Sequence, residues 1–145
     1  MILLLNQSLN REKWFTVNKE LSREWLNKAE EDFGFASKNL SDPTISYYSQ
    51  ICFHFQQAAE KYLKAYIVDN VLEFKKTHDL PELLRICVNK EATLKTLEDE
   101  CELLTDYYIE TRYPVHWPSD ISKEDAEKSR KAAMKIKESI QALLI

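Results

Sequence analysis

The fold is decided by residues 48–66, which read YSQICFHFQQAAEKYLKAY. Their apolar side chains recur every three or four residues, and this spacing aligns them along one face of an α-helix of about five turns. The stripe consists of Tyr48, Cys52, Phe55, Ala59, Tyr62 and Tyr66. A second line beside it consists of Ile51, Ala58 and Ala65. The stretch therefore predicts a central helix that is buried on a broad face.

The polar residues of the same stretch share a separate face, made by His54, Gln57, Lys61 and Lys64. The simplest interpretation is a solvated face beside a core helix. However, two of these residues lie near small alanines, which allow another helix to approach closely, so some polar groups could lie in a crevice. For His54 we favour a histidine whose ring is satisfied between helices over one that faces a ligand.

Length and composition indicate one globular domain. The chain has 145 residues, of which 44% are hydrophobic and 30% are charged, which is typical of a chain with a proper core. A single Gly and four Pro leave room for long helices and little room for the turns of an all-β fold. The formal net charge of -4 excludes a non-specific nucleic-acid binder, although a local basic patch is allowed.

The cysteines and histidines do not indicate a metal site or a disulfide framework. Cys52, Cys87 and Cys101 are widely spaced and fall on apolar stripes, so we interpret them as reduced core residues of a cytoplasmic protein. The three scattered His lack the spacing of zinc ligands, no Glu-x-x-His pair occurs, and one Gly cannot make a phosphate loop. We therefore expect no metal and no cofactor. The apolar residues 1–5 are too few for a signal segment or a membrane span, and we expect no membrane association.

The remaining periodicity predicts an all-α fold, an up-and-down antiparallel bundle of about five helices. We divide the chain into an N-terminal extension, residues 1–19, in which Trp14 and Phe15 would be anchors, and a helical domain, residues 20–145. Helices are expected over 21–40, 43–71, 80–89, 92–113 and from 122 onward. The expected caps are Ser22, Asp42, Asp79 with Glu82, and Ser122 with Asp125.

The order of these segments resembles that of HEPN-domain proteins, whose name stands for "higher eukaryotes and prokaryotes nucleotide-binding". The segments that carry the resemblance are EWLNKAEEDF at 24–33, CFHFQQAAEKYLKAYI at 52–67, THDLPELL at 77–84 and YYIETRYP at 107–114. The resemblance covers roughly residues 21–144. It implies a five-helix bundle, a homodimer, and a prokaryotic protein often encoded beside a minimal nucleotidyltransferase as a toxin–antitoxin pair. Many proteins of the family are metal-independent ribonucleases, and others are non-catalytic binding modules.

The family's ribonucleases carry an Arg followed, after four to six residues, by a His. The nearest match here is Arg112 and His116, which are separated by three residues that include Pro114. The resemblance implies that His116 takes the proton from a ribose 2′-hydroxyl while Arg112 stabilises charge on the phosphate. Because Pro114 breaks the helix between them, we expect cleavage to be weak or absent. The alternative is that Arg112 is a cation favoured at a helix C-terminus and His116 a loop residue.

Aromatic residues around this motif could hold a base. Tyr108 and Tyr113 flank Arg112 in the sequence and offer stacking surfaces, and we add His54 and Lys61 as candidate nucleotide-binding residues. The tyrosines would serve equally well as interface anchors. For His78 we expect a turn role. The leading hypothesis is a protein that binds a nucleotide or RNA and works with a nucleotidyltransferase. The rival is a non-catalytic helical dimer that acts as a protein interaction module.

Overall fold

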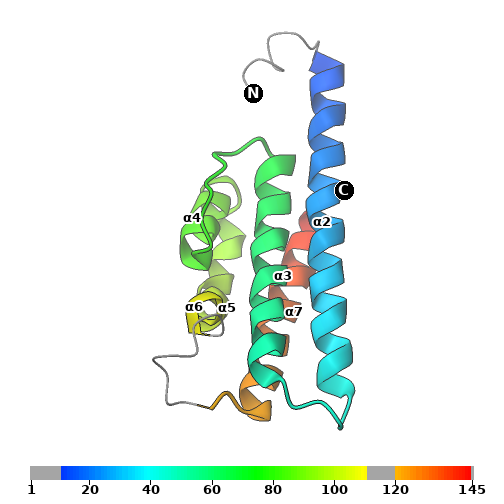
Figure 1. The fold of residues 1–145 in the computed structure, drawn as a ribbon. Helices are drawn as coiled ribbons and strands as arrows, with labels where there is room; N and C mark the ends of the chain where they lie inside the picture. Colours follow the sequence, from blue (N-terminus) through cyan, green and yellow to red (C-terminus); the bar gives the residue numbers. More distant parts are fainter. Residues whose placement is uncertain (1–10, 111–119, 145) are drawn as a thin grey trace.

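In the computed structural model, which describes residues 11–110 and 120–144, every regular element of these ranges is a helix (Figure 1). The expected all-α class is therefore confirmed. None of the described helices combines the length and apolar character that crossing a membrane requires. The elements in chain order are α2 (Arg11–Ser41), α3 (Tyr48–Asp69), α4 (Leu80–Lys90), the 3-10 helix η1 (Ala92–Leu97), α5 (Glu98–Thr105), α6 (Tyr107–Glu110) and α7 (Lys123–Leu143).

Helix α3 is the centre of the bundle, as its apolar stripe predicts. It packs against α2 along most of its length and against α7, while α4, α5 and α6 lie on its other side (Figure 1). Ile51, Phe55 and Tyr62 are fully buried, and the neighbouring stripe of alanines is buried with them. Both apolar lines of α3 are buried because other helices cover three of its sides. The polar residues of α3 therefore lie in the seams between helices.

Helix α2 begins ten residues earlier than expected, at Arg11 rather than near residue 21. Residues 11–20 contain no Gly or Pro, so nothing in them stops the helix. With 31 residues it is about 46 Å long, and its N-terminal end extends beyond α3 (Figure 1). Ser22 is not a cap, because its hydroxyl lies inside the helix and donates to the carbonyl oxygen of Ala65 at 3.1 Å. The side chains of Trp14 and Phe15 lie outside the described residues.

The connection between α2 and α3 is longer than expected. We expected a helix from residue 43 with Asp42 as its cap, but α3 begins at Tyr48. The Asp42 carboxylate instead accepts from the backbone N–H of Thr44 at 2.9 Å and from its hydroxyl at 2.6 Å. These bonds stabilise a turn in place of a helix start.

Helix α3 ends in a turn that requires a left-handed residue, and a valine occupies it. Val71 has a φ of 54°, which is rare for a β-branched residue. Its N–H donates to the carbonyl of Val68 at 3.2 Å, and the N–H of Leu72 donates to Ile67 at 2.9 Å. This pair of bonds is the Schellman pattern, in which Gly is the usual residue.

Helix α4 begins where expected, at Leu80, but its start is satisfied by another helix. The Asp79 side chain makes no capping bond, and Glu82 pairs with Lys75 at 3.0 Å. The backbone N–H of Leu80 donates to the hydroxyl of Thr105 at 3.0 Å. The end of α5 is thereby tied to the start of α4.

The single helix expected over 92–113 is divided into η1, α5 and α6 within the described residues. Threonine side chains bond locally at its start, where the Thr96 hydroxyl donates to the carbonyl of Thr93 at 3.1 Å and Thr93 donates to Glu91 at 2.8 Å. Such bonds favour a 3-10 turn over an α-helix. A break at Asp106 then separates α5 from α6, which carries Tyr108.

Helix α7 confirms the predicted capping box. The Ser122 hydroxyl accepts from the N–H of Asp125 at 3.1 Å, and the Asp125 carboxylate accepts from the N–H of Ser122 at 2.8 Å. Each of these two residues accepts a hydrogen bond from the backbone N–H of the other, which fixes the start of α7 directly after Ser122.

Candidate functional site

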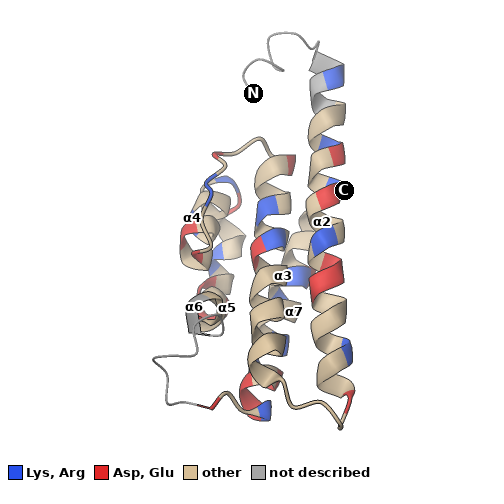
Figure 2. Cartoon of the chain, viewed as in Figure 1, with Lys and Arg blue, Asp and Glu red and all other residues tan. Residues whose placement is uncertain are grey.

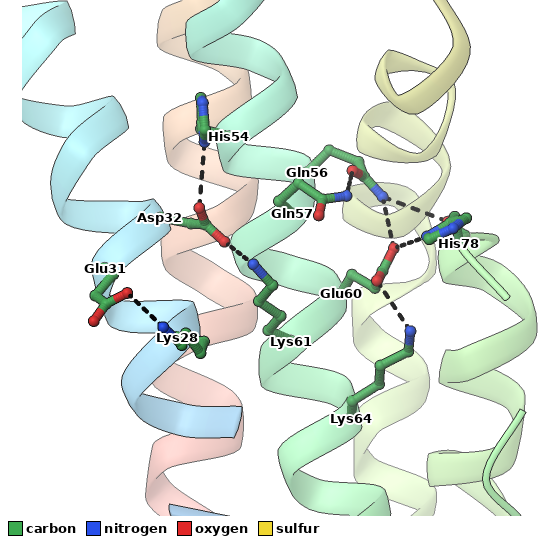
Figure 3. A network of polar contacts seen from close by, with 10 residues as sticks. All are labelled: Lys28, Glu31, Asp32, His54, Gln56, Gln57, Glu60, Lys61, Lys64 and His78. Carbon is green, nitrogen blue, oxygen red and sulfur yellow. Dashed lines mark hydrogen bonds and ion pairs between the residues drawn. The ribbon is translucent and has the colours of Figure 1, made fainter. Parts of the chain in front are cut away.

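The polar face of α3 is not simply solvated. Its residues lie in two seams, one toward α2 and one toward the segment that leads into α4, and each seam holds a carboxylate between a histidine and a lysine (Figure 3). We call these two arrangements the Asp32 triad, with His54 and Lys61, and the Glu60 triad, with His78 and Lys64.

The Asp32 triad joins α2 to α3. Nδ1 of His54 lies 3.2 Å from one oxygen of Asp32, and Nζ of Lys61 lies 2.5 Å from the other. Burial opposes ionisation of Asp32, but the hydrogen bonds from His54 and Lys61 outweigh it and hold its pKa below the ordinary value. The carboxylate is therefore ionised at neutral pH and only accepts, which places the proton of the neutral imidazole on Nδ1.

The Glu60 triad is more deeply buried. The Glu60 carboxylate accepts from Lys64 at 3.0 Å and lies 2.8 Å from Nδ1 of His78, while the two α3 side chains are 4% and 7% exposed. Gln56, which is fully buried, donates from its amide to Glu60 and to the backbone carbonyl of His78, both at 3.4 Å. Gln57 in turn donates to Gln56 at 2.8 Å. The His78 side chain is 49% exposed, so its imidazole faces solvent while the buried Glu60 carboxylate holds its Nδ1.

Lys64 is enclosed by aromatic rings as well as by its carboxylate. Its ammonium nitrogen lies 5.5 Å from the ring centre of Trp25 and 5.7 Å from that of Phe74, and these two rings pack at 5.8 Å. Ring faces attract a cation that has lost water. Two aromatic rings thus stabilise the cation of the buried ion pair in addition to the Glu60 carboxylate.

In both triads the carboxylate fixes the imidazole and leaves its second nitrogen, Nε2, without a hydrogen bond to the described residues. An imidazole oriented in this way can accept a proton or a hydrogen bond at Nε2, or donate one when it is protonated. His54 and His78 are therefore both oriented so that Nε2 can contact a polar ligand.

A row of aromatic rings connects the two histidines across α3. Tyr108 stacks on His78 with centroids 3.9 Å apart and 14° between the planes, and Phe53 lies 6.2 Å from Tyr108. Phe53 lies 5.5 Å from His54, which in turn lies 4.6 Å from Phe35. We call these five residues the ring row. A surface hollow of about 450 Å³ opens at its His78 end, lined by His78, Asp79, Thr105, Asp106 and Tyr108.

Several of the predicted site residues are brought into this arrangement. Tyr108 stacks on His78, and His54 and Lys61 meet on Asp32, so His54 lies between α2 and α3 with its Nδ1 held by a carboxylate, as the favoured interpretation expects, while its Nε2 is left for another partner. Arg112, Tyr113 and His116 lie outside the described residues.

Sequence reasoning missed the residues that organise the site, namely Asp32, Glu60 and the ring of His78. Asp32 belongs to an acidic run that is typical of a solvated helix face. A usable signal was the placement of Glu60 four residues before Lys64, an orientation that favours a pair on one helix face. In the ranges that the structure covers, no group of three or more His, Cys, Asp or Glu residues is arranged to hold a metal ion.

The comparisons with known proteins agree with this architecture. TT1696 from Thermus thermophilus, a solved structure, is 27% identical, with a TM-score of 0.75 over 83% of this chain and 96% of that one. ST0689, described as an archaeal HEPN homologue, is 24% identical and shares the fold, with a TM-score of 0.67 over 86% of this chain and 98% of its own. No curated protein matches the chain. The model of the HEPN domain matches residues 22–143, and the chain therefore belongs to the HEPN domain family.

Proposed function

We propose that the protein binds a nucleotide or RNA at the His78 end of the ring row. The observation that carries this proposal is the parallel stack of Tyr108 on His78 beside the hollow. A base can add to such a stack, since stacking on aromatic side chains is the common way in which single-stranded nucleic acid is held. Nε2 of His78, oriented by the buried Glu60, supplies a hydrogen-bonding group at the same place.

We further propose that Arg112, four residues after Tyr108, holds a phosphate of this ligand, with Tyr113 as a second stacking ring. An Arg guanidinium makes a bidentate phosphate contact that Lys cannot reproduce. His116 is our candidate for proton transfer in RNA cleavage, which we expect to be weak or absent because Pro114 shortens and breaks the Arg–His motif. This cleavage would require no metal.

Binding is tested by titrating the purified protein with ATP and with a panel of labelled RNAs. We expect Tyr108→Ala and Arg112→Lys to weaken binding at unchanged helical content. The matched control is Leu103→Ala, because Leu103 is an exposed apolar residue of α5 that borders Lys128 and Lys131 of α7 rather than the ring row. Equal affinities for wild type, Tyr108→Ala and Arg112→Lys would contradict the proposal.

We also propose a cytoplasmic homodimer that works with a minimal nucleotidyltransferase as a toxin–antitoxin type of system. Three buried cysteines that are not joined in disulfides are consistent with a reducing compartment. Exposed apolar side chains away from the ring row are available for contact with a second protein surface, namely Leu21, Tyr47, Val71 and Phe74. Light scattering at tens of micromolar should give the dimer mass, and a nucleotidyltransferase reading frame should adjoin the gene. A dimer that binds no nucleotide or RNA would favour the alternative, a non-catalytic interaction module.

A further inference from the structure

The ring row extends well past the hollow, and we infer that it forms a second base-stacking subsite at Phe35 and His54, so that the ligand is a single-stranded RNA rather than a mononucleotide. This inference rests on the proposed function, because it uses the His78 end of the row as the first subsite. It adds the class of ligand and a second place of contact on the opposite side of α3.

The second subsite is built from two helices. Phe35 of α2 is 52% exposed, and its ring lies 4.6 Å from that of His54 of α3, at 60°. The His54 side chain is 29% exposed and cannot turn freely, because Asp32 holds its Nδ1. A ring held in this way loses little conformational freedom when a base packs on it, which favours binding.

The rings between the two ends make the path continuous. Phe53 contacts both His54 and Tyr108, and each of the ring-to-ring steps along the row lies between 3.9 and 6.2 Å. These distances fall within the range in which aromatic groups interact with one another. A strand of a few nucleotides can therefore follow the row from one end to the other, with bases against its rings.

The charges along the row fit stacking better than phosphate binding. The N-terminal half of α3, which carries Phe53 and His54, has no Lys, Arg, Asp or Glu (Figure 2). Lys61 and Lys64 lie farther along the helix, and each is neutralised by the carboxylate of its triad. Affinity from the row should therefore come mainly from ring contacts, with a weak dependence on salt, in contrast to a basic groove.

Single-stranded RNA is favoured over a peptide because each end of the row pairs an aromatic face with an oriented imidazole. His54 and His78 each present Nε2 beside a ring, and a base offers a π-face together with hydrogen-bonding edges. An apolar side chain of a peptide can cover a ring face but offers no hydrogen bond to the neighbouring imidazole, whereas a single base supplies both contacts.

The experiment is a length series. Binding of oligouridylates of one, two, four and eight nucleotides is measured by calorimetry for wild type, Phe35→Ala, Tyr108→Ala and the control Leu103→Ala. We expect wild-type affinity to rise with length. We expect Tyr108→Ala to weaken every ligand, and Phe35→Ala to weaken only the longer ones, by about 5- to 150-fold, the loss typical of one removed stacking ring. Repeating the longest ligand at several salt concentrations should show a shallow slope.

The possible failures are distinguishable. If mononucleotide and octanucleotide bind equally well, or if Phe35→Ala binds every length as wild type does, the second subsite is overturned while the proposed function stands. If no ligand binds, both fail. If Phe35→Ala changes the oligomeric state in light scattering without changing RNA affinity, Phe35 belongs to a protein interface and the inference is overturned.

Discussion

His78 and Tyr108 stack with their ring planes 14° apart, although one residue precedes α4 and the other lies in α6. Glu60 holds Nδ1 of His78 at 2.8 Å, so Tyr108 stacks on a ring whose orientation is fixed by a carboxylate in the middle of α3. The candidate site is therefore connected to the bundle core. We expect substitutions in the Glu60 triad to change the position of the Tyr108 ring.

The effects of substituting Glu60 and Lys64 on the free energy of unfolding should be strongly coupled. Lys64→Met leaves a buried carboxylate without its cation, and we expect it to lower the free energy of unfolding by about 3–5 kcal/mol. Glu60→Gln should cost a similar amount, whereas the double variant should cost clearly less than the sum of the two. Urea denaturation of the four proteins measures this coupling.

The matched control for this cycle is the exposed pair Lys28 and Glu31, whose side chains are 66% and 68% exposed (Figure 3). Lys28→Met should change stability by less than about 0.5 kcal/mol. If Lys64→Met were no more damaging than Lys28→Met, the triad would not be the buried, charged arrangement described above.

The Asp32 triad should make a pH-dependent contribution to stability. The pKa of Asp32 is lower in the folded state than the ordinary value of 3.8, so its contribution is present above that value and is lost as pH falls through the folded pKa. The Tm difference between wild type and Asp32→Asn should therefore be largest near pH 6 and shrink below about pH 4. Asp99→Asn, on the exposed surface of α5, is the control. A difference that stays constant down to about pH 2.5 would show that Asp32 stabilises the fold without its charge.

Val71→Gly should stabilise the protein. Val71 has a left-handed φ of 54° and is 58% exposed, so a glycine relieves backbone strain and loses little packing. We expect a gain of a few tenths to about 1 kcal/mol, since the relief outweighs the greater chain entropy of glycine when unfolded. Val68→Gly, inside α3, should instead destabilise by about 1 kcal/mol or more. Thermal unfolding of both variants checks the sign, and a destabilised Val71→Gly would contradict the strained turn.

The three cysteines should be inert until the protein unfolds. All are buried, and burial raises the pKa of Cys87 and of Cys101 to about 12, so both thiols stay protonated at about pH 8. Since the thiolate is the reactive form, a disulfide reagent should modify no cysteine rapidly in the native protein and all of them in urea. Rapid labelling of the native protein would mean that the core around α3 and α4 opens readily.

The fold was largely predictable because apolar periodicity reports directly on burial. The stripe through Phe55 located the central helix, and the Ser122–Asp125 box located the start of α7. Local signals failed where a tertiary bond replaced them. Ser22 donates across to α3 instead of capping, and Asp79 leaves the cap of α4 to Thr105.

The site was less predictable because it depends on pairs that are distant in the sequence. Asp32 and His54 are 22 residues apart, as are Gln56 and the carbonyl of His78. The periodicity of α3 located the polar face but could not tell which acidic residue of a neighbouring helix would meet it. Tyr108 was predicted as a stacking residue, but its partner His78 was assigned to a turn. The two rings meet because the helix breaks at Asp106, and no pattern in the sequence indicates that break.

The most direct test of the central claim is nuclear magnetic resonance of the side-chain rings of the full-length protein during titration with a short RNA. Binding at the ring row predicts that the signals of His78 and Tyr108 move first and most, followed by those of His54 and Phe35 as the RNA is lengthened. Shifts that gather instead around Arg85 and Lys95, which line a separate hollow between α4 and η1, would contradict the account, as would a titration in which no ring signal moves.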